Sequence, residues 1–130
     1  MNKKYIAAAI IEQDGKILLA QLGRKSDPLY GLWEFPGGKV EGDETLQECL
    51  QRELYEELGI QANIGHYFSS SFFVHNDMDY EMSFFKVQTY QGRIRLHEHL
   101  AIAWVTIQEL SDYQYPAPDL PIVALLQRYY

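Results

Sequence analysis

One helix near the middle of the sequence constrains the fold most, because it directs acidic side chains toward the side that must be buried. Thr45 and Glu48 have the spacing of a capping box, and Gly59 supplies a left-handed stop, so we expect this helix to end at Leu58. At about 100° per residue its apolar side chains gather on one arc, which should pack against a sheet. The members of this arc are Leu46, Cys49, Leu50 and Leu54.

Glutamates interrupt the apolar arc. Glu53 and Glu57 fall inside it, and Glu56 lies at its edge. An unpaired carboxylate directed at a core is very costly, or it remains protonated. Residues 34–57 hold eight acids and only two bases, and they carry −6 of the chain's net charge of −7. Because these two bases cannot neutralise so many acids, the helix predicts a bound cation in preference to a solvated charged face.

The ligand chemistry indicates which cation to expect. Carboxylates three and four residues apart on a helix form an all-oxygen cluster, which Mg²⁺ or Mn²⁺ prefers. Gly37 and Gly38 precede the helix, and we expect them to form a tight turn with an inward carbonyl as a further ligand. Magnesium held by few protein ligands shares substrate phosphates, so the pattern predicts phosphoryl chemistry on a polyphosphate. Mg²⁺ is the expected cofactor, with Mn²⁺ as the alternative.

Composition narrows the partners and the location. A concentrated acidic charge argues against binding of nucleic acid polymers, which requires a basic face. No apolar run reaches the roughly 18 residues of a membrane span, and the N-terminus lacks a signal-peptide core, so we expect a cytoplasmic protein without membrane contact. The single cysteine, Cys49, excludes an internal disulfide. We expect one domain over residues 1–130, as a monomer or a homodimer.

The remaining pattern predicts an α/β fold with a mixed β-sheet and two principal helices. Residues 6–12 and 16–22 are β-rich runs joined by Asp14-Gly15, a pair typical of tight hairpins. A short strand is expected over residues 32–35. Asp119 is predicted to cap the second helix, which buries Ile122, Val123, Leu125 and Leu126. Further strands are expected over residues 62–74, 80–90, 93–96 and 101–105.

A motif of constrained spacing runs through the helix: Gly38, five residues, Glu44, seven residues and then Arg52-Glu53-Leu54-Tyr55-Glu56-Glu57-Leu58-Gly59-Ile60. It matches every fixed position of the Nudix box, so the sequence resembles the Nudix hydrolase family. Outside the box, the segments 32–39 and 115–119 are similar to the MutT branch, whose members clean the nucleotide pool. His97-Glu98-His99 followed by Trp104 resembles the CTP pyrophosphohydrolases of that branch.

This resemblance implies an α/β/α sandwich and Mg²⁺-dependent cleavage of a nucleoside triphosphate to monophosphate and pyrophosphate. It implies that Glu53, Glu56 and Glu57 bind the metal with the carbonyl of Gly37 or Gly38. Arg52 and Glu44 would orient these glutamates. Glu98 would be a ligand or the general base, and Glu53 is the rival base.

The resemblance also predicts the class of substrate, which is CTP-type or an oxidised purine nucleotide such as 8-oxo-dGTP. A dinucleoside polyphosphate or a nucleotide sugar is the alternative within the family. A module that binds a nucleotide without cleaving it is the alternative outside catalysis.

Substrate contacts are the least constrained part of the sequence. Relatives often carry arginine at the end of the second strand, but this chain has Leu22-Gly23, so Arg24, Lys25 or Lys39 would meet the phosphates. Asp119 would line the base pocket, and an ionised carboxylate there would favour CTP over UTP because it only accepts hydrogen bonds. His97 and His99 alternate around Glu98 and could form a metal cluster, but we expect surface strand positions for both and assign them no role. The residues placed to stack on a base, with core packing as the alternative, are Phe35, Phe73 and Met82.

Overall fold

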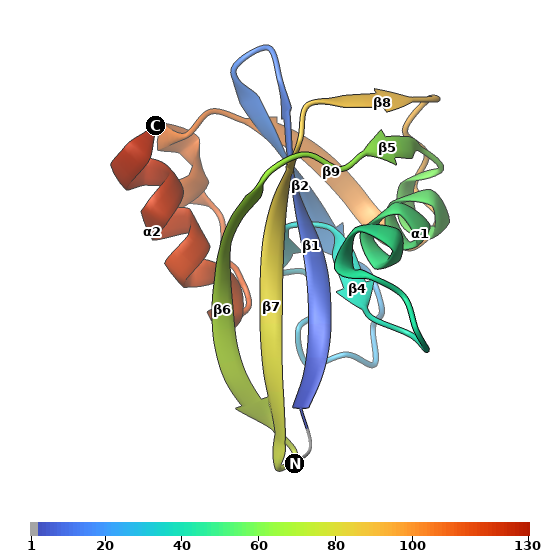
Figure 1. Cartoon of the computed structure of the whole chain (residues 1–130). Helices are drawn as coiled ribbons and strands as arrows, with labels where there is room; N and C mark the ends of the chain where they lie inside the picture. Colours follow the sequence, from blue (N-terminus) through green and yellow to red (C-terminus); the bar gives the residue numbers. More distant parts are fainter. Residues whose placement is uncertain (1–2) are drawn as a thin grey trace.

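The computed structural model describes residues 3–130 and shows a strongly twisted mixed sheet with one long helix on each face (Figure 1). The strand order along the sheet is β3-β2-β1-β7-β6, while β4 pairs with β1 and β9 pairs with β2. A separate two-stranded sheet joins β5 and β8. The elements are β1 (Lys3–Gln13), β2 (Lys16–Leu22), β3 (Trp33–Glu34), β4 (Gly37–Lys39), α1 (Leu46–Leu58), β5 (Gln61–Asn63), β6 (Tyr67–His75), β7 (Met78–Val87), β8 (Thr89–Gln91), β9 (His99–Val105) and α2 (Leu120–Tyr129).

Local turn chemistry fixes the centre of the sheet. Asp14 and Gly15 both adopt positive φ, 53° and 75°, which is the conformation that a two-residue hairpin between β1 and β2 requires. On its other side β1 pairs in parallel with β7 from Lys3 to Ile11. The predicted hairpin and the mixed sheet are therefore confirmed.

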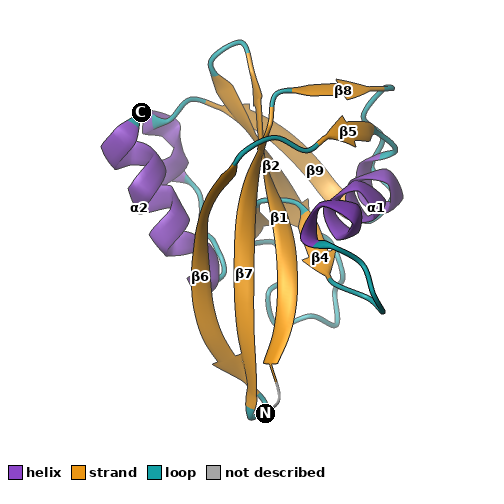
Figure 2. Ribbon diagram, in the orientation of Figure 1, coloured by secondary structure: helices purple, strands orange, loops and turns teal. Residues whose placement is uncertain are grey.

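The helices cover opposite faces of the sheet (Figure 2). On α1, Thr45 and Glu48 form both bonds of the capping box, and Gly59 closes the helix at φ 71°, as predicted. Even and odd positions of the strands feed two separate cores, because successive side chains of a strand point to opposite faces. One core, beneath α1, includes Cys49, Leu50, Leu54 and Leu58; the other, beneath α2, includes Phe35, Phe84, Ile122 and Leu126.

Three strand predictions require correction. The run 62–74 divides into β5 and β6, and the run 80–90 divides into β7 and β8. Residues 93–96 form no strand. Instead, Arg95 N–H donates to Leu58 O at 2.8 Å and His97 N–H donates to Glu57 O at 3.1 Å. This segment therefore satisfies free carbonyls at the C-terminal end of α1, a role that strand periodicity does not reveal.

The two glycines before α1 lie in a strand and not in the tight turn that we expected. Gly37 and Gly38 belong to β4 and pair with Ala8 and Ala7 of β1. Glycine is needed here for close approach: a Cβ on Gly37 would lie 2.1 Å from the carbonyl oxygen of Ala7, and one on Gly38 would lie 2.3 Å from the Glu53 carboxyl group. Strand β4 therefore passes directly beside the acidic side of α1.

Within residues 3–130, neither helix has the length and apolar character that crossing a membrane would demand.

Candidate active site

The side chains of Glu53, Glu56 and Glu57 on helix α1 differ in their exposure to solvent. The side chain of Glu57 is 6% exposed and that of Glu53 is 15% exposed, whereas that of Glu56 is 50% exposed. Glu53 and Glu57 are one helical turn apart and both turn toward the sheet, as their place in the apolar arc predicted. The result is a line of carboxylates that runs from the core to the surface.

Arg52 organises the outer part of this line. Its guanidinium binds Glu44 through two hydrogen bonds of 2.6 and 3.0 Å, and its Nη1 lies 3.1 Å from both Glu53 and Glu56. It also donates to the carbonyl of Lys39 at 3.1 Å, which ties α1 to β4. Hydrogen bonding to Arg52 lowers the pKa of the Glu44 carboxyl, and the same bond raises the pKa of Arg52. This fixed network sets the positions of Glu53 and Glu56.

The inner part of the line ends in a cluster formed by three elements. Glu34 of β3, Glu57 of α1 and His99 of β9 each offer a ligand atom, and these atoms lie within 4.8 Å of one another. His99 Nε2 lies 2.9 Å from Glu34 Oε2 and 3.8 Å from Glu57 Oε1. Glu57 Oε1 is buried and has no hydrogen-bond partner among the described residues. The cluster therefore contains a buried carboxyl oxygen that accepts no hydrogen bond and lies 3.8 Å from the His99 imidazole.

The electrostatics of the site favour a bound cation. Burial raises the pKa of Glu57 to about 10, and the negative charges of Glu34, Glu53 and Glu98 act in the same direction. Burial also raises the pKa of Glu53, while Arg52 opposes that rise. For Glu34, burial raises the pKa and the hydrogen bond to His99 lowers it. Only a positive charge close to these oxygens lets all three ionise together.

One of the two glycine carbonyls is free to join the site. Ala9 N–H donates to Pro36 O and Val40 N–H donates to Tyr5 O, which fixes the alternation of hydrogen bonds along the β1–β4 ladder. In that alternation Gly38 belongs to a hydrogen-bonded pair and Gly37 to a non-hydrogen-bonded pair. The carbonyl of Gly37 therefore points away from β1, while that of Gly38 is used in the ladder.

A NUDIX domain model matches residues 1–126 of the chain. The chain belongs to the Nudix family. Its similarity to individual Nudix proteins also extends over nearly the full length. It is 43% identical to the CTP pyrophosphohydrolase of Escherichia coli K12, over 95% of this chain and 90% of the relative. It is 32% identical to the 8-oxo-dGTP diphosphatase of Buchnera aphidicola subsp. Schizaphis graminum, over 98% of this chain and 96% of the relative.

Solved structures confirm the Nudix fold. The solution structure of the E. coli ORF135 protein superposes with a TM-score of 0.87 at 42% identity, covering 95% of this chain and 88% of that one. The crystal structure of the MutT protein from Methanosarcina mazei Go1 superposes with a TM-score of 0.85 at 27% identity, covering 98% and 94%. The predicted sandwich of a mixed sheet between helices is therefore confirmed.

Two members of the inner cluster lie outside the Nudix box, and sequence analysis did not assign them. We expected His99 at the surface, but its side chain is only 4% exposed. In the sequence, Glu34 was treated only as one of the eight acids in residues 34–57. A signal for it was present, because Trp33 and Phe35 pack into the core beneath α2 and so direct Glu34 to the opposite face. Glu34 pairs with Ala20 of β2 and His99 pairs with Leu22, so the two side chains meet diagonally across β2.

The other two residues of the His97–His99 segment lie outside the cluster. Glu98 is exposed and is not among the three groups that converge, although its charge reaches both Glu34 and Glu57. His97 is also exposed, as expected, and its Nδ1 lies 2.9 Å from the carbonyl of Glu56.

Residues predicted to stack on a base lie mainly in the core. Phe35 is 1% exposed, stacks on Tyr115 and meets the edge of Phe84. Met82 is buried in the same core. Phe73 is half-buried and stacks on Tyr80 with ring centroids 4.8 Å apart. Stacking by Phe35 is therefore corrected to core packing, since both of its neighbours are aromatic side chains of the protein itself.

Cations that could meet phosphates lie apart from the cluster. Arg24 is exposed in the loop after β2. Lys39 is exposed at the end of β4, where its Nζ lies 5.5 Å from the centroid of the Tyr80 ring. Of the two, Lys39 is adjacent to the glutamates, because its carbonyl accepts a bond from Arg52.

Asp119 is not the helix cap that we predicted. It has helical dihedral angles, makes no capping bond through its side chain, and is 2% exposed with Oδ1 unpartnered among the described residues. Burial raises its pKa well above the ordinary value, the charge of Glu34 adds to the rise, and a bond from the Phe35 backbone opposes it. Burial therefore favours the protonated carboxyl, which both donates and accepts hydrogen bonds, over the acceptor-only carboxylate that we expected.

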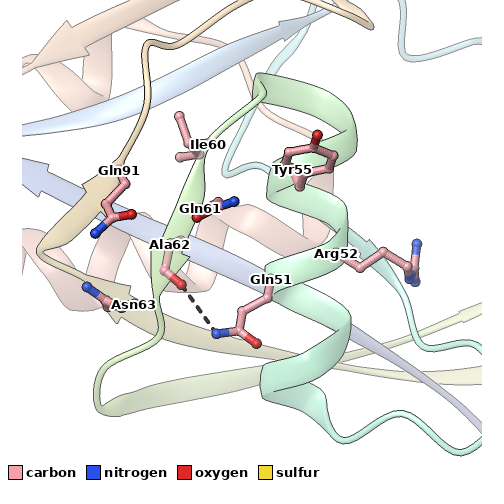
Figure 3. A pocket seen from close by; sticks show the side chains of 8 residues that line it. All are labelled: Gln51, Arg52, Tyr55, Ile60, Gln61, Ala62, Asn63 and Gln91. Atoms are coloured by element: carbon pink, nitrogen blue, oxygen red, sulfur yellow. Dashed lines mark hydrogen bonds between the residues drawn. The ribbon is translucent and has the colours of Figure 1, made fainter.

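A separate surface hollow of about 590 Å³ opens between α1, β5 and β8 (Figure 3). Gln51 Nε2 crosses it to donate to Ala62 O at 3.4 Å. None of the acidic candidates among the described residues lines this hollow, although Arg52 does.

Proposed function

We propose that this protein is a divalent-metal-dependent nucleoside triphosphate pyrophosphohydrolase that releases a nucleoside monophosphate and pyrophosphate. The observation that carries the proposal is the buried, unpartnered oxygen of Glu57, one turn from Glu53 on a helix that Arg52 holds in place. Such an oxygen is stable as a carboxylate only beside a cation. The names of two relatives, CTP pyrophosphohydrolase and 8-oxo-dGTP diphosphatase, support the reaction class.

The donor set fits Mg²⁺, or Mn²⁺ in its place. Glu53, Glu56 and Glu57 would hold the metal together with the carbonyl of Gly37, which the strand ladder leaves free. When bound, the metal supplies positive charge that binds the phosphates and offsets the charge that develops during cleavage. Arg52 and Glu44 keep the glutamates in position and prevent them from moving apart through mutual repulsion.

The protein must also take a proton from the attacking water. Two carboxylates can serve as this base: Glu53, which is partly buried and bound to Arg52, and Glu98, which is exposed beside the cluster. Replacement of the true base by glutamine should lower kcat by about 100-fold or more with little change in the binding of substrate. Comparing Glu53→Gln with Glu98→Gln in single-turnover reactions therefore assigns the role.

For the substrate we propose CTP-type nucleotides or oxidised purine nucleotides such as 8-oxo-dGTP. Asp119 supports this choice, because a buried carboxyl that donates and accepts can pair with the hydrogen-bonding edge of a base. Lys39 and Arg24 are the proposed contacts to phosphate, and Phe73 and Met82 border the base. Phe35 would support this pocket from the core without stacking on the base itself.

A nucleotide panel tests the proposal directly. The protein with Mg²⁺ is incubated with CTP, UTP, dGTP, 8-oxo-dGTP, a nucleotide sugar and a dinucleoside polyphosphate, and pyrophosphate and monophosphate are quantified. Pyrophosphate release from CTP or 8-oxo-dGTP that Glu57→Gln abolishes is the expected result. Turnover of only the nucleotide sugar or the dinucleoside polyphosphate would replace the proposed substrate. Tight nucleotide binding without any turnover would show a binding module in place of an enzyme.

A further inference from the structure

The contact between Glu34, Glu57 and His99 brings together strands β3 and β9 with helix α1, so three separate segments contribute to it. Glu34 and His99 meet diagonally across β2, where Glu34 pairs with Ala20 and His99 pairs with Leu22. Nε2 is the imidazole nitrogen that faces both carboxylates, at 2.9 Å from Glu34 and 3.8 Å from Glu57. A nitrogen donor therefore joins an oxygen site that the Nudix box alone would leave entirely acidic.

An ordinary structural ion pair does not account for this arrangement. A bond between His99 and Glu34 satisfies one carboxylate, but it leaves Glu57 Oε1 buried and unpartnered beside the same imidazole. Arg52 does not compensate it, because its bonds go to Glu44, Glu53, Glu56 and Lys39. Within residues 3–130 no other cationic side chain forms an ion pair with Glu57. A cation bound beside the imidazole would supply the positive charge that this oxygen requires when Glu57 is ionised.

We propose that Glu34, Glu57 and His99 together bind one divalent cation, and that the imidazole of His99 biases this site toward Mn²⁺ over Mg²⁺. The inference rests on the proposed function, since Glu57 is one of its metal ligands. Carboxylate oxygens suit both ions, but Mg²⁺ favours a shell of oxygens, whereas imidazole suits transition metals. A ligand set of two carboxylates and one imidazole therefore favours Mn²⁺ over Mg²⁺ more strongly than glutamates alone do.

The site predicts a specific pattern of affinities. His99→Gln removes the nitrogen donor and should weaken the binding of Mn²⁺ by about tenfold, with a smaller loss for Mg²⁺. Glu34→Gln should weaken both ions to a similar extent, because it removes an oxygen that both accept. His97→Gln is the matched control: His97 lies two residues away on the same segment, but its ring is exposed and lies outside the cluster, with Nδ1 2.9 Å from the Glu56 carbonyl.

Electron paramagnetic resonance of the intact protein with Mn²⁺ alone tests the proposal. Electron spin-echo envelope modulation detects a nitrogen bound directly to Mn²⁺ through its nuclear coupling. We expect nitrogen modulation in the wild type and in His97→Gln, and its loss in His99→Gln. Free Mn²⁺, counted from its aqueous signal, gives the affinities of all variants, and circular dichroism confirms that each is folded.

The outcomes separate this inference from the proposed function. Mn²⁺ that binds to the wild type, is lost in Glu57→Gln and shows no nitrogen modulation would overturn the role of His99 while leaving the glutamate site intact. Modulation that persists in His99→Gln would also overturn it. A wild type that binds no Mn²⁺ and releases no pyrophosphate would remove both proposals. Because the decisive spectrum is that of the wild type, the test does not depend on a variant that folds.

Discussion

Each face of the sheet buries one carboxyl group, and the two groups have opposite surroundings. Glu57, beneath α1, lies among other ionisable groups, including Glu53 and Glu34. Asp119, at the start of α2, lies on the aromatic side of the sheet, beside Phe35 and Tyr115. The first environment supplies many charges and requires a cation. The second supplies almost no charge and suits an uncharged carboxyl that pairs with a neutral ring.

The two environments are joined by Glu34. Its negative charge raises the pKa of Glu57 and also that of Asp119, from a strand only two residues long. Neutralising Glu34 with a cation would therefore ease the ionisation of both groups. The proposed metal site and the proposed base pocket are coupled through this one side chain, although they lie on different faces.

Glu57→Gln should have the largest effect on turnover, because it removes the buried charge beneath α1 and leaves Asp119 unchanged. We expect turnover with Mg²⁺ to fall by about 100-fold or more, with loss of metal binding and a folded protein. Asp119→Asn, measured in parallel, should keep its affinity for metal. An unchanged rate for Glu57→Gln at limiting Mg²⁺ would contradict the assignment.

Gly38→Ala tests the closeness of β4 to the glutamates. Its Cβ would lie 2.3 Å from the Glu53 carboxyl, which can move aside because it ends a flexible side chain. We expect a folded protein with metal affinity reduced by about tenfold, as for displaced supporting groups of metal sites. In contrast, Gly37→Ala would place Cβ against the backbone of Ala7 and should lower the melting temperature strongly. Equal effects of the two substitutions on stability would contradict this distinction.

Substitution of Asp119 tests whether this carboxyl is uncharged and pairs with the base. Asparagine has one donor and one acceptor group, as a protonated carboxyl does, so Asp119→Asn should keep the CTP to UTP ratio of kcat/KM within about twofold at neutral pH. Asp119→Ala removes the pairing group and should change that ratio by about tenfold. A shift of the ratio in the asparagine variant as large as that in alanine would indicate that the native group is ionised.

The smallest expected effect is on stability as pH changes. Folding raises the pKa of Asp119, so the folded protein keeps a proton that the unfolded chain releases above about pH 4. This proton contributes its full stabilisation of the folded state below that pH, and the contribution is lost as pH rises through the folded-state pKa. The metal-free protein should therefore melt at a higher temperature at pH 5 than at pH 8. In Asp119→Asn this difference should shrink by a few degrees, since about 1 kcal/mol corresponds to roughly 4 °C. A difference that Asp119→Asn leaves unchanged would assign the pH dependence to other groups.

The sequence predicted α1 with its cap, its stop and its inward glutamates, because each depends on residues within one or two helical turns. It also predicted the Asp14-Gly15 hairpin for the same reason. The meeting of Glu34 with His99 could not be predicted. It depends on which strands flank β2 and on an irregular register between Gln21 and Leu22, and both are set by the whole sheet.

Asp119 shows a different limit of sequence reasoning. An aspartate one residue before an apolar helix is the usual sign of an N-cap, yet here a turn of 3₁₀ helix precedes α2 and already gives Asp119 helical dihedral angles. A capping residue needs an extended backbone, so the side chain turns inward instead. The local pattern identified where the helix begins but not where the carboxyl points.

The two bonds from Arg95 and His97 to the last turn of α1 have a consequence for how the family can diversify. They fasten the segment that bears Glu98 and His99 to the helix that bears Glu57, independently of the 33 residues between Gly59 and Arg93 that contain β5 to β8. Insertions or deletions in the loops between these strands can therefore alter the outer surface without shifting the spacing of the acidic groups, whereas β7 must stay paired with β1. Evolution is free to remodel one part of the protein while the reactive centre stays in register.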